Sequence, residues 1–348
     1  MIFRKNPRLK TLCLDPTYEC PLNCPTCNSN SIAKSFKEGE LLEYKDYENI
    51  IDQFTKMKGS DIEISGGEPL LREDIFHIIR YAKDKGLKVS MFTNALLLNE
   101  ERSKELLNTG IDLLRFSLEG VGERYDLIRG KGTFAKFLLA LKTFLRIKKF
   151  YHDNKPEMEF RVTVSRYNAS HLADILFLAQ ELGIDHIVYQ YLSRVDPREN
   201  LRTEEMLKGP FMKEINHWDL PSEILVAPDQ LRSLREEVKK IKTLSEKLYL
   251  YAHIDPVLDS RFNEFSITTG RFILTKRCYV LWNSIIIEPD GKIAPCPMLT
   301  HFPISNIKEC HLRDFWLNNK RLNFIRGTLL KEKYLPICYY CCRHVPLM

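Results

Sequence analysis

The 348-residue chain is 44% hydrophobic and 28% charged, which is typical of a globular protein with a full-sized core and excludes disorder as its main character. No apolar run approaches the length of a membrane span and no signal peptide precedes the first element, so we expect a cytoplasmic protein without a membrane partner. The net charge of +6 is modest, and we interpret the basic run at 142–149 as a solvated helix face rather than a nucleic-acid site.

Short strand-like runs alternate with amphipathic helical segments along the first half of the chain, which predicts a parallel sheet covered by helices. The expected strands lie at 9–14, 61–65, 88–93, 113–118, 159–165 and 186–191. The expected helices lie at 43–57, 72–85, 100–108, 134–151 and 171–182. These six βα-like units predict an α/β fold, a partial (β/α)6 TIM-like barrel with its chemistry at the carboxyl ends of the strands.

The first loop after a strand holds three cysteines within eight residues, Cys20, Cys24 and Cys27. A zinc ion or a closed iron–sulfur cluster takes four protein ligands, and no fourth Cys or His follows nearby. A [4Fe-4S] cluster bound here therefore keeps one iron open for a small-molecule ligand. A zinc loop completed by a distant residue and a disulfide pair are the alternatives.

The spacing of these cysteines, with three and then two residues between them, resembles the signature of the radical S-adenosylmethionine (SAM) enzymes. In that family the open iron binds the amino and carboxylate groups of SAM, and an electron from the cluster releases a 5′-deoxyadenosyl radical. The resemblance implies a SAM-binding [4Fe-4S] cluster and SAM as cofactors. It also implies a flavodoxin- or ferredoxin-type electron donor.

The second strand runs into Gly66-Gly67-Glu68-Pro69. Two adjacent glycines let the backbone bend sharply and let a ligand approach without meeting a Cβ, and Glu68 places an acceptor beside that gap. The element resembles the Gly-Gly-Glu-Pro motif of radical SAM enzymes, which implies that Gly66, Gly67 and Glu68 bind the SAM amino group. An ordinary turn is the alternative.

Three further residues near strand ends are candidate SAM contacts. Ser117 opens Ser-Leu-Glu-Gly, which is similar to the Ser-Leu-Asp-Gly of the family, with Glu119 in place of Asp. The resemblance assigns Ser117 and Arg129 to the ribose and carboxylate of SAM, because an Arg fork matches a carboxylate. A surface salt bridge is the alternative for Arg129. Asn94 ends the third strand, where it contacts SAM or caps a turn.

The last part of the chain carries a second set of cysteines. A β-hairpin turning at Asp290-Gly291 is expected to bring two of them side by side, and a helix at 311–326 to return two more. The four expected thiolate ligands of an auxiliary [4Fe-4S] cluster are Cys278, Cys296, Cys338 and Cys341.

This arrangement is similar to the SPASM and twitch extensions of radical SAM enzymes. The single-cluster twitch form is favoured because the sequence stops seven residues after Cys341. Cys342 is the alternative last ligand, and a structural zinc site is the alternative to the cluster. We interpret Cys13, Cys310 and Cys342 as buried small residues, or one of them as a hydrogen-atom donor.

The middle of the chain is less informative. A polar stretch at 196–200 and a long helix at 222–249 precede a loop whose charged residues are candidate substrate contacts. These candidates are His253, Asp255, Arg261 and Glu264. The expected domains are the barrel at 1–215, a connecting helical region at 216–275 and the auxiliary-cluster domain at 276–348.

The parts predict a radical SAM oxidoreductase that abstracts a hydrogen atom from a polar small molecule, such as a sugar or aminocyclitol, with the auxiliary cluster as electron acceptor. The alternative is a peptide-modifying enzyme in a ribosomal natural-product pathway, which performs crosslinking, epimerisation or side-chain oxidation. So few residues precede the first strand that a peptide-recognition domain has no room there, which favours the small molecule. A non-catalytic iron- or zinc-binding protein is the third class.

Overall fold

The strands in the described part of the protein belong to one sheet. The computed structural model describes residues 7–27, 41–151, 155–207, 220–255, 264–272, 277–300 and 302–341. Its strands are β1 (Thr11–Leu14), β2 (Asp61–Ile64), β3 (Lys88–Thr93), β4 (Leu113–Ser117), β5 (Glu157–Val164), β6 (His186–Tyr191), β7 (Tyr251–Asp255), β8 (Ser284–Ile287), β9 (Lys292–Ala294) and β10 (Ser305–Asn306). Within the described ranges they lie in the order β10-β9-β8-β1-β2-β3-β4-β5-β6-β7.

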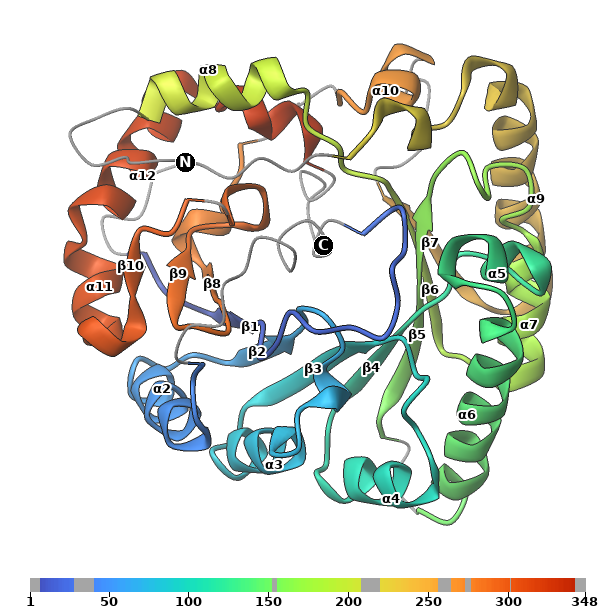
Figure 1. Ribbon diagram of the computed structural model, residues 1–348, viewed down its shortest axis with the longest axis horizontal. Coiled ribbons are helices and arrows are strands. Elements are labelled where there is room, and N and C mark those ends of the chain that lie inside the picture. Colours follow the sequence, from blue (N-terminus) through green and yellow to red (C-terminus); the bar gives the residue numbers. More distant parts are fainter. Residues whose placement is uncertain are drawn as a thin grey trace.

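Helices connect and cover these strands. They are α2 (Tyr44–Lys56), α3 (Ile75–Asp84), α4 (Glu100–Asn108), α5 (Glu123–Arg129), α6 (Thr133–Lys148), α7 (Asp174–Leu182), α8 (Pro197–Leu207), α9 (Leu231–Leu248), α10 (Glu264–Thr269), α11 (Leu312–Asn318) and α12 (Lys320–Glu332). Figure 1 shows the strands curving as an arc, with α3, α4, α6 and α7 along its outer side. The predicted α/β partial barrel is confirmed.

The pairing is parallel from β8 through β1 to β7, and antiparallel in the β8–β9–β10 segment. Leu14 of β1 lies opposite Ile64 of β2 on one side and Ile287 of β8 on the other. The carboxyl ends of these strands therefore meet at one edge of the sheet, where the loops that follow them gather.

Side chains alternate between the two faces of the sheet. Leu12, Ile62 and Leu114 belong to the buried core under the helices, whereas Glu63 and Arg115 on the concave face are only partly buried. The concave residues pair with one another: Arg115 contacts Glu63 at 3.1 Å and Glu159 at 3.4 Å, and Arg161 contacts Glu159 at 2.7 Å. The inner surface of the barrel is therefore polar and held by ion pairs.

Several helix boundaries differ from the sequence-based prediction, among them the end of α6 at Lys148 instead of 151 and the start of α7 at Asp174 instead of 171. The helix expected to start at residue 72 begins at Ile75, after a 3-10 turn at Pro69–Leu71. The helix expected at 222–249 begins at Leu231, because Pro228 opens a separate turn before it. The helix expected at 311–326 is two helices, because Asn319 leaves the helical conformation and its side chain caps α12 by accepting the N–H of Leu322.

The expected loop of substrate contacts is partly a strand. His253 and Asp255 lie in β7, which pairs in parallel with β6 and places His253 opposite Val188. Glu264 begins α10, and Arg261 lies outside the described residues. The polar stretch at 196–200 runs into α8. The sheet contains strands from all three expected domains, 1–215, 216–275 and 276–348. The division into these domains stays a prediction.

Within the described ranges, no helix combines the length and the apolar character that crossing a membrane requires.

Candidate functional site

The cysteine loop is pinned to the Gly66-Gly67-Glu68 segment by main-chain hydrogen bonds. The N–H of Gly67 donates to the carbonyl of Thr17 and the N–H of Glu68 to that of Glu19, both at 2.7 Å. A Cβ on Gly67 would lie 2.1 Å from the Glu19 oxygen, and one on Gly66, at φ +100°, 2.4 Å from the Thr17 oxygen. In the structure these glycines make room for the cysteine loop itself, and their contact with SAM stays a prediction.

The three cysteines of the loop form no disulfide, are half-buried and lie close enough to influence one another. The pKa of Cys24 is raised to about 12, chiefly by burial; Arg129 lowers it, and Glu119 and the thiols of Cys27 and Cys20 contribute to the rise. Gathered, desolvated thiols form thiolates only when a positive centre lies among them. Cys20, Cys24 and Cys27 therefore fit the cluster that the sequence predicts.

Glu68 is 1% exposed and its carboxylate is taken up by protein donors. One oxygen accepts the hydroxyl of Thr93 at 2.7 Å and the N–H of Leu70 at 3.2 Å, and the other accepts the N–H of Asn94 at 2.7 Å. Burial raises the pKa of Glu68 in spite of these donors. The side chain thus ties the end of β2 to the end of β3, and a bond to the SAM ammonium stays a prediction.

Asn94 meets the cysteine loop directly. Its side-chain Nδ2 donates to the sulfur of Cys20 at 3.7 Å, while its Oδ1 accepts the N–H of Leu96 at 3.0 Å. The turn cap that the sequence suggests is present, and the thiol contact was not foreseen. A contact with SAM stays untested.

Arg129 forms a buried, two-pronged ion pair with Glu119. Its Nε lies 2.5 Å and its Nη2 2.8 Å from the two carboxylate oxygens, with 9% and 5% of the two side chains exposed. The salt bridge of the alternative interpretation is therefore present, but it is buried and does not lie on the surface. The longer arm of Glu119 reaches the guanidinium of Arg129, and this pair lies beside Cys24. A role of Arg129 toward the SAM carboxylate stays a prediction.

Ser117 ends β4 and lies opposite Arg161 of β5 in the sheet register. Both are partly exposed and project from positions of the concave face. Arg161 donates to Gln190 at 3.4 Å and lies 5.7 Å from the ring of Phe92. The predicted SAM contact at Ser117 thus adjoins the polar inner surface of the barrel.

The four cysteines of the second set line one small cavity of about 20 Å³. The expected hairpin is present: β8 and β9 pair with Ile287 opposite Ile293, and Gly291 turns the chain at φ +84°. Burial raises the pKa of Cys338 to about 12, and it raises that of Cys296 further, with added effects of Cys338 and Cys278. Cys342 lies outside the described residues.

Four thiols around an apolar cavity, with burial raising the pKa of Cys278, Cys296 and Cys338, fit an iron–sulfur cluster, whose ligands bind different iron atoms. Among the described residues, no three His, Cys, Asp or Glu side chains converge as closely as the ligands of a single ion. Of the remaining thiols, Cys13 is buried and donates to Glu63 at 3.9 Å, and Cys310 donates to the carbonyl of Asn306 at 3.2 Å.

A buried carboxyl near the cysteine loop was missed by sequence reasoning. Glu288 follows β8 and Asp15 follows β1, so the two occupy neighbouring positions of the paired strands. Burial, then Asp15 and Asp290, raise the pKa of Glu288 to about 8. An acid directly before a Pro-Asp-Gly turn normally faces solvent, and only the pairing of β8 with β1 buries this one.

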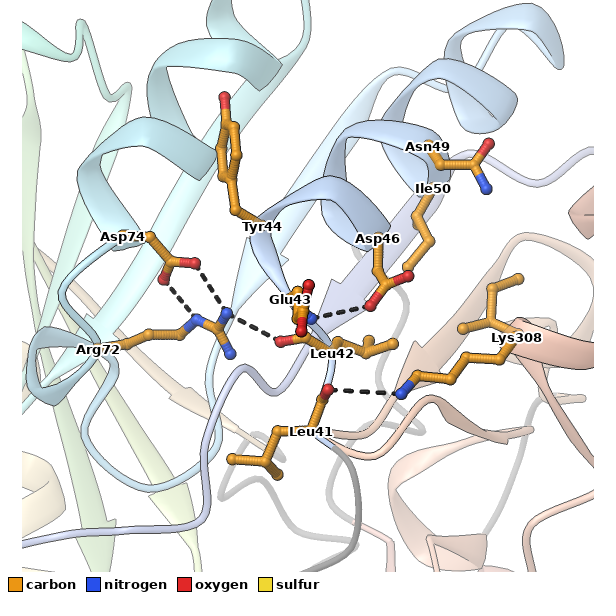
Figure 2. Close-up of a pocket in the computed structure, with 11 residues that line it drawn as sticks. Leu41, Leu42, Glu43, Tyr44, Asp46, Asn49, Ile50, Arg72, Asp74 and Lys308 are labelled. Carbon is orange, nitrogen blue, oxygen red and sulfur yellow. Dashed lines mark hydrogen bonds and ion pairs between the residues drawn. The ribbon is translucent and has the colours of Figure 1, made fainter.

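A cavity of about 980 Å³ opens at the start of α2 (Figure 2). Arg72 holds Asp74 and the carbonyl of Leu42 there, and Lys308 donates to the carbonyl of Leu41. No site residue expected from the sequence lines it. The cavity therefore lies apart from both cysteine sets.

Comparisons with known proteins agree with this arrangement. The model of the radical SAM superfamily matches residues 14–152, and that of the SPASM iron–sulfur cluster-binding domain matches residues 278–342. An AdoMet-dependent heme synthase of Methanosarcina barkeri is 28% identical, covering 96% of this chain and 89% of its own. A PqqA peptide cyclase of Bradyrhizobium diazoefficiens is 23% identical, covering 90% and 74%.

Two solved structures share the fold. Streptococcus suis SuiB bound to S-adenosylmethionine has a TM-score of 0.65 at 18% identity, covering 93% of this chain and 68% of its own. The anSMEcpe enzyme with bound AdoMet has a TM-score of 0.64 at 18% identity, covering 96% and 89%. The single-cluster twitch form stays a prediction.

The radical SAM model covers the first cysteine set, and the SPASM model covers the second. The cofactors are therefore SAM, a SAM-binding [4Fe-4S] cluster and an auxiliary iron–sulfur cluster. The chain belongs to the radical SAM superfamily and carries a C-terminal SPASM domain.

Proposed function

We propose that this enzyme uses a SAM-derived radical to modify a peptide. The observation that carries the proposal is the similarity to PqqA peptide cyclases over 90% of the chain, in two organisms. Solved neighbours of the same fold include SuiB with the precursor peptide SuiA and anSMEcpe with a peptide. The expectation of a sugar or aminocyclitol substrate has less support than this alternative.

The residues of the chain hold the reacting parts in place. Cys20, Cys24 and Cys27 would hold the cluster at the carboxyl ends of the strands, and SAM bound there would supply the radical chemistry. The Glu68 carboxylate joins the ends of β2 and β3, and the N–H of Glu68 donates to Glu19 of this loop. The four thiols of the second set bind the auxiliary cluster, which supplies electron-transfer chemistry.

The concave face of the barrel is the proposed substrate surface. Arg161 and Gln190 present hydrogen-bonding groups beside Ser117, and the ring of Phe92 lies 4.9 Å from the guanidinium of Arg115. A peptide offers main-chain carbonyls and N–H groups throughout, so this mixed polar surface suits it. The ion pairs keep the surface rigid, which orients the substrate hydrogen toward the radical.

A second candidate is the conversion of a porphyrin precursor to heme. It is favoured by the heme synthase of Methanosarcina barkeri, which has a higher identity to this chain than the peptide cyclases named above. Arg115 and Arg161 on the concave face would exchange part of their ion pairs with Glu63 and Glu159 for the carboxylates that such precursors carry.

The first test concerns the radical site. Anaerobic reconstitution should give roughly eight irons per chain, and Ala at Cys20, Cys24 and Cys27 should leave roughly four and abolish 5′-deoxyadenosine formation from SAM and dithionite. Cys310→Ala is the matched control, because that thiol lies in neither set and should leave both readouts unchanged. Continued SAM cleavage in the triple variant would refute the site.

The second test separates the substrates. The reconstituted enzyme is incubated with SAM and dithionite and either a short peptide encoded beside the gene or an iron porphyrin with carboxylate side chains. A peptide that loses hydrogen atoms or gains a crosslink, seen by mass spectrometry, supports the proposal. Heme formation, seen by absorption, supports the second candidate instead, and turnover of neither compound overturns both.

A further inference from the structure

We propose that Asn94 is a positioning residue of the radical site, whose side-chain amide raises the reduction potential of the SAM-binding cluster through its hydrogen bond to Cys20. The inference rests on the assignment of Cys20, Cys24 and Cys27 as cluster ligands. The bond joins Asn94 Nδ2 to Cys20 Sγ at 3.7 Å, and Asn94 is 5% exposed. The donor is therefore shielded from water, and Cys20 itself is half-buried.

The direction of the amide is fixed by its other end. Asn94 Oδ1 accepts the N–H of Leu96 at 3.0 Å, a main-chain donor that requires an oxygen opposite it. The NH₂ group must then face the sulfur, since turning the amide over would set two donors against each other. The hydrogen bond to Cys20 is thus dictated by the surrounding contacts.

The backbone of the same residue is also held. Asn94 N–H donates to Glu68 at 2.7 Å, and the Glu68 carboxylate is itself fixed by Thr93 and Leu70. Asn94 is therefore anchored through both its main chain and its side chain. An anchored donor costs no reorganisation when charge on the cluster changes.

The effect on the cluster follows from charge. Reduction adds an electron to the iron–sulfur unit, part of which resides on the ligand sulfurs, and an N–H aimed at a sulfur stabilises that added charge. The backbone N–H of Leu22 is a second donor to Cys20, whereas the buried Glu68 acts in the opposite direction. Without the Asn94 amide, Cys20 keeps the Leu22 N–H as a donor while the negative charge of Glu68 remains nearby. Reduction of the cluster therefore becomes less favourable.

The test is a redox titration of the holoenzyme followed by electron paramagnetic resonance, without SAM. Asn94→Leu keeps the side-chain volume and removes the donor. We expect the midpoint potential of the SAM-binding cluster to become more negative, while that of the auxiliary cluster, held by other cysteines, stays unchanged as an internal reference.

Two further variants keep the test decisive. Asn94→Asp retains the acceptor for Leu96 and so preserves the turn, and it should also make the potential more negative at a pH where it is ionised. Asn168→Leu is the matched control. That residue is 1% exposed and its amide donates only to the carbonyls of Glu119 and Thr163, so its loss should leave both potentials unchanged.

Unchanged potentials in both Asn94 variants with full iron content would overturn the inference, as would equal shifts of both clusters. A change in SAM affinity with an unchanged potential would also overturn it, since Asn94 would then act on SAM. If Ala at Cys20, Cys24 and Cys27 leaves the SAM-sensitive signal intact, the site assignment has failed instead. The two failures are thus distinguishable.

Discussion

Replacing Gly67 by Ala should damage the radical site without unfolding the protein. The added Cβ would lie 2.1 Å from the Glu19 carbonyl oxygen, and 2.7 Å from the carbonyl carbons of Glu19 and Tyr18. Main-chain atoms cannot turn away as a flexible side chain does. Because Cβ contacts under 3.0 Å essentially never occur, the cysteine loop must move by about 1 Å relative to β2.

The cost can be worked from the contacts that this shift breaks. The hydrogen bonds from Gly67 to Thr17 and from Glu68 to Glu19 contribute about 1 kcal/mol each, so about 2 kcal/mol is lost. A domain stable by about 5–15 kcal/mol survives that loss. Cys20 follows Glu19 directly and moves with it, and a displacement of about 1 Å at a reacting site costs about 100-fold in rate.

The assay measures iron per chain and the rate of 5′-deoxyadenosine formation from SAM and dithionite, with circular dichroism to verify folding. Gly327→Ala in α12 is the matched control, because no atom lies within 4 Å of the Cβ it would carry and helical Ala stabilises by up to about 1 kcal/mol. A folded Gly67→Ala enzyme with normal iron content and normal rate would refute the reasoning.

Three other substitutions have defined outcomes. Glu288→Gln removes a carboxyl whose pKa is raised from 4.5 to about 8 by burial and by Asp15. The folded parent loses stability as this carboxyl loses its proton with rising pH, so the variant should be more stable than the parent above about pH 8 and equally stable below about pH 4.5. Thermal unfolding across this pH range measures the difference, and an unchanged pH slope would contradict the prediction. Arg129→Leu leaves Glu119 buried without its partner and should destabilise by about 3–5 kcal/mol in denaturant titrations, with most of the loss restored when Glu119→Leu is added; no recovery would count against the pair. Cys296→Ala should remove the auxiliary cluster, and thus roughly four irons, while 5′-deoxyadenosine formation persists; full iron content would argue against this ligand.

The sequence predicts the repeating strands and helices of the barrel well, because each carries its own periodicity. It does not predict β7, in which apolar and polar residues alternate over only five positions after a long helix and whose place depends on pairing with β6. The break at Asn319 was missed for a related reason. The apolar pattern of the two helices runs on across it, and the cap is visible only in the backbone angles.

The site shows the same division. The spacing of the cysteines predicts both cluster sites, because cysteine is itself a metal ligand and can be recognised in the sequence. The neighbours of Gly67 and Arg129 could not be predicted, since Glu19 lies on another segment of the chain and Glu119 meets Arg129 only after α5 folds back. The sequence pattern therefore predicted that SAM approaches Gly66 and Gly67, whereas in the structure the cysteine loop lies against these glycines.

The parallel pairing of β8 with β1 has a consequence for how the SPASM segment is studied. The strand before the cysteine loop, β1, pairs with β2 on one side and with β8 on the other. Cutting away the C-terminal segment would strip one flank of that strand and leave a row of N–H and C=O groups bare. If a truncated enzyme failed to cleave SAM, the cause would thus be the disrupted β1 strand. The contribution of the auxiliary cluster is better measured by replacing its cysteines one at a time.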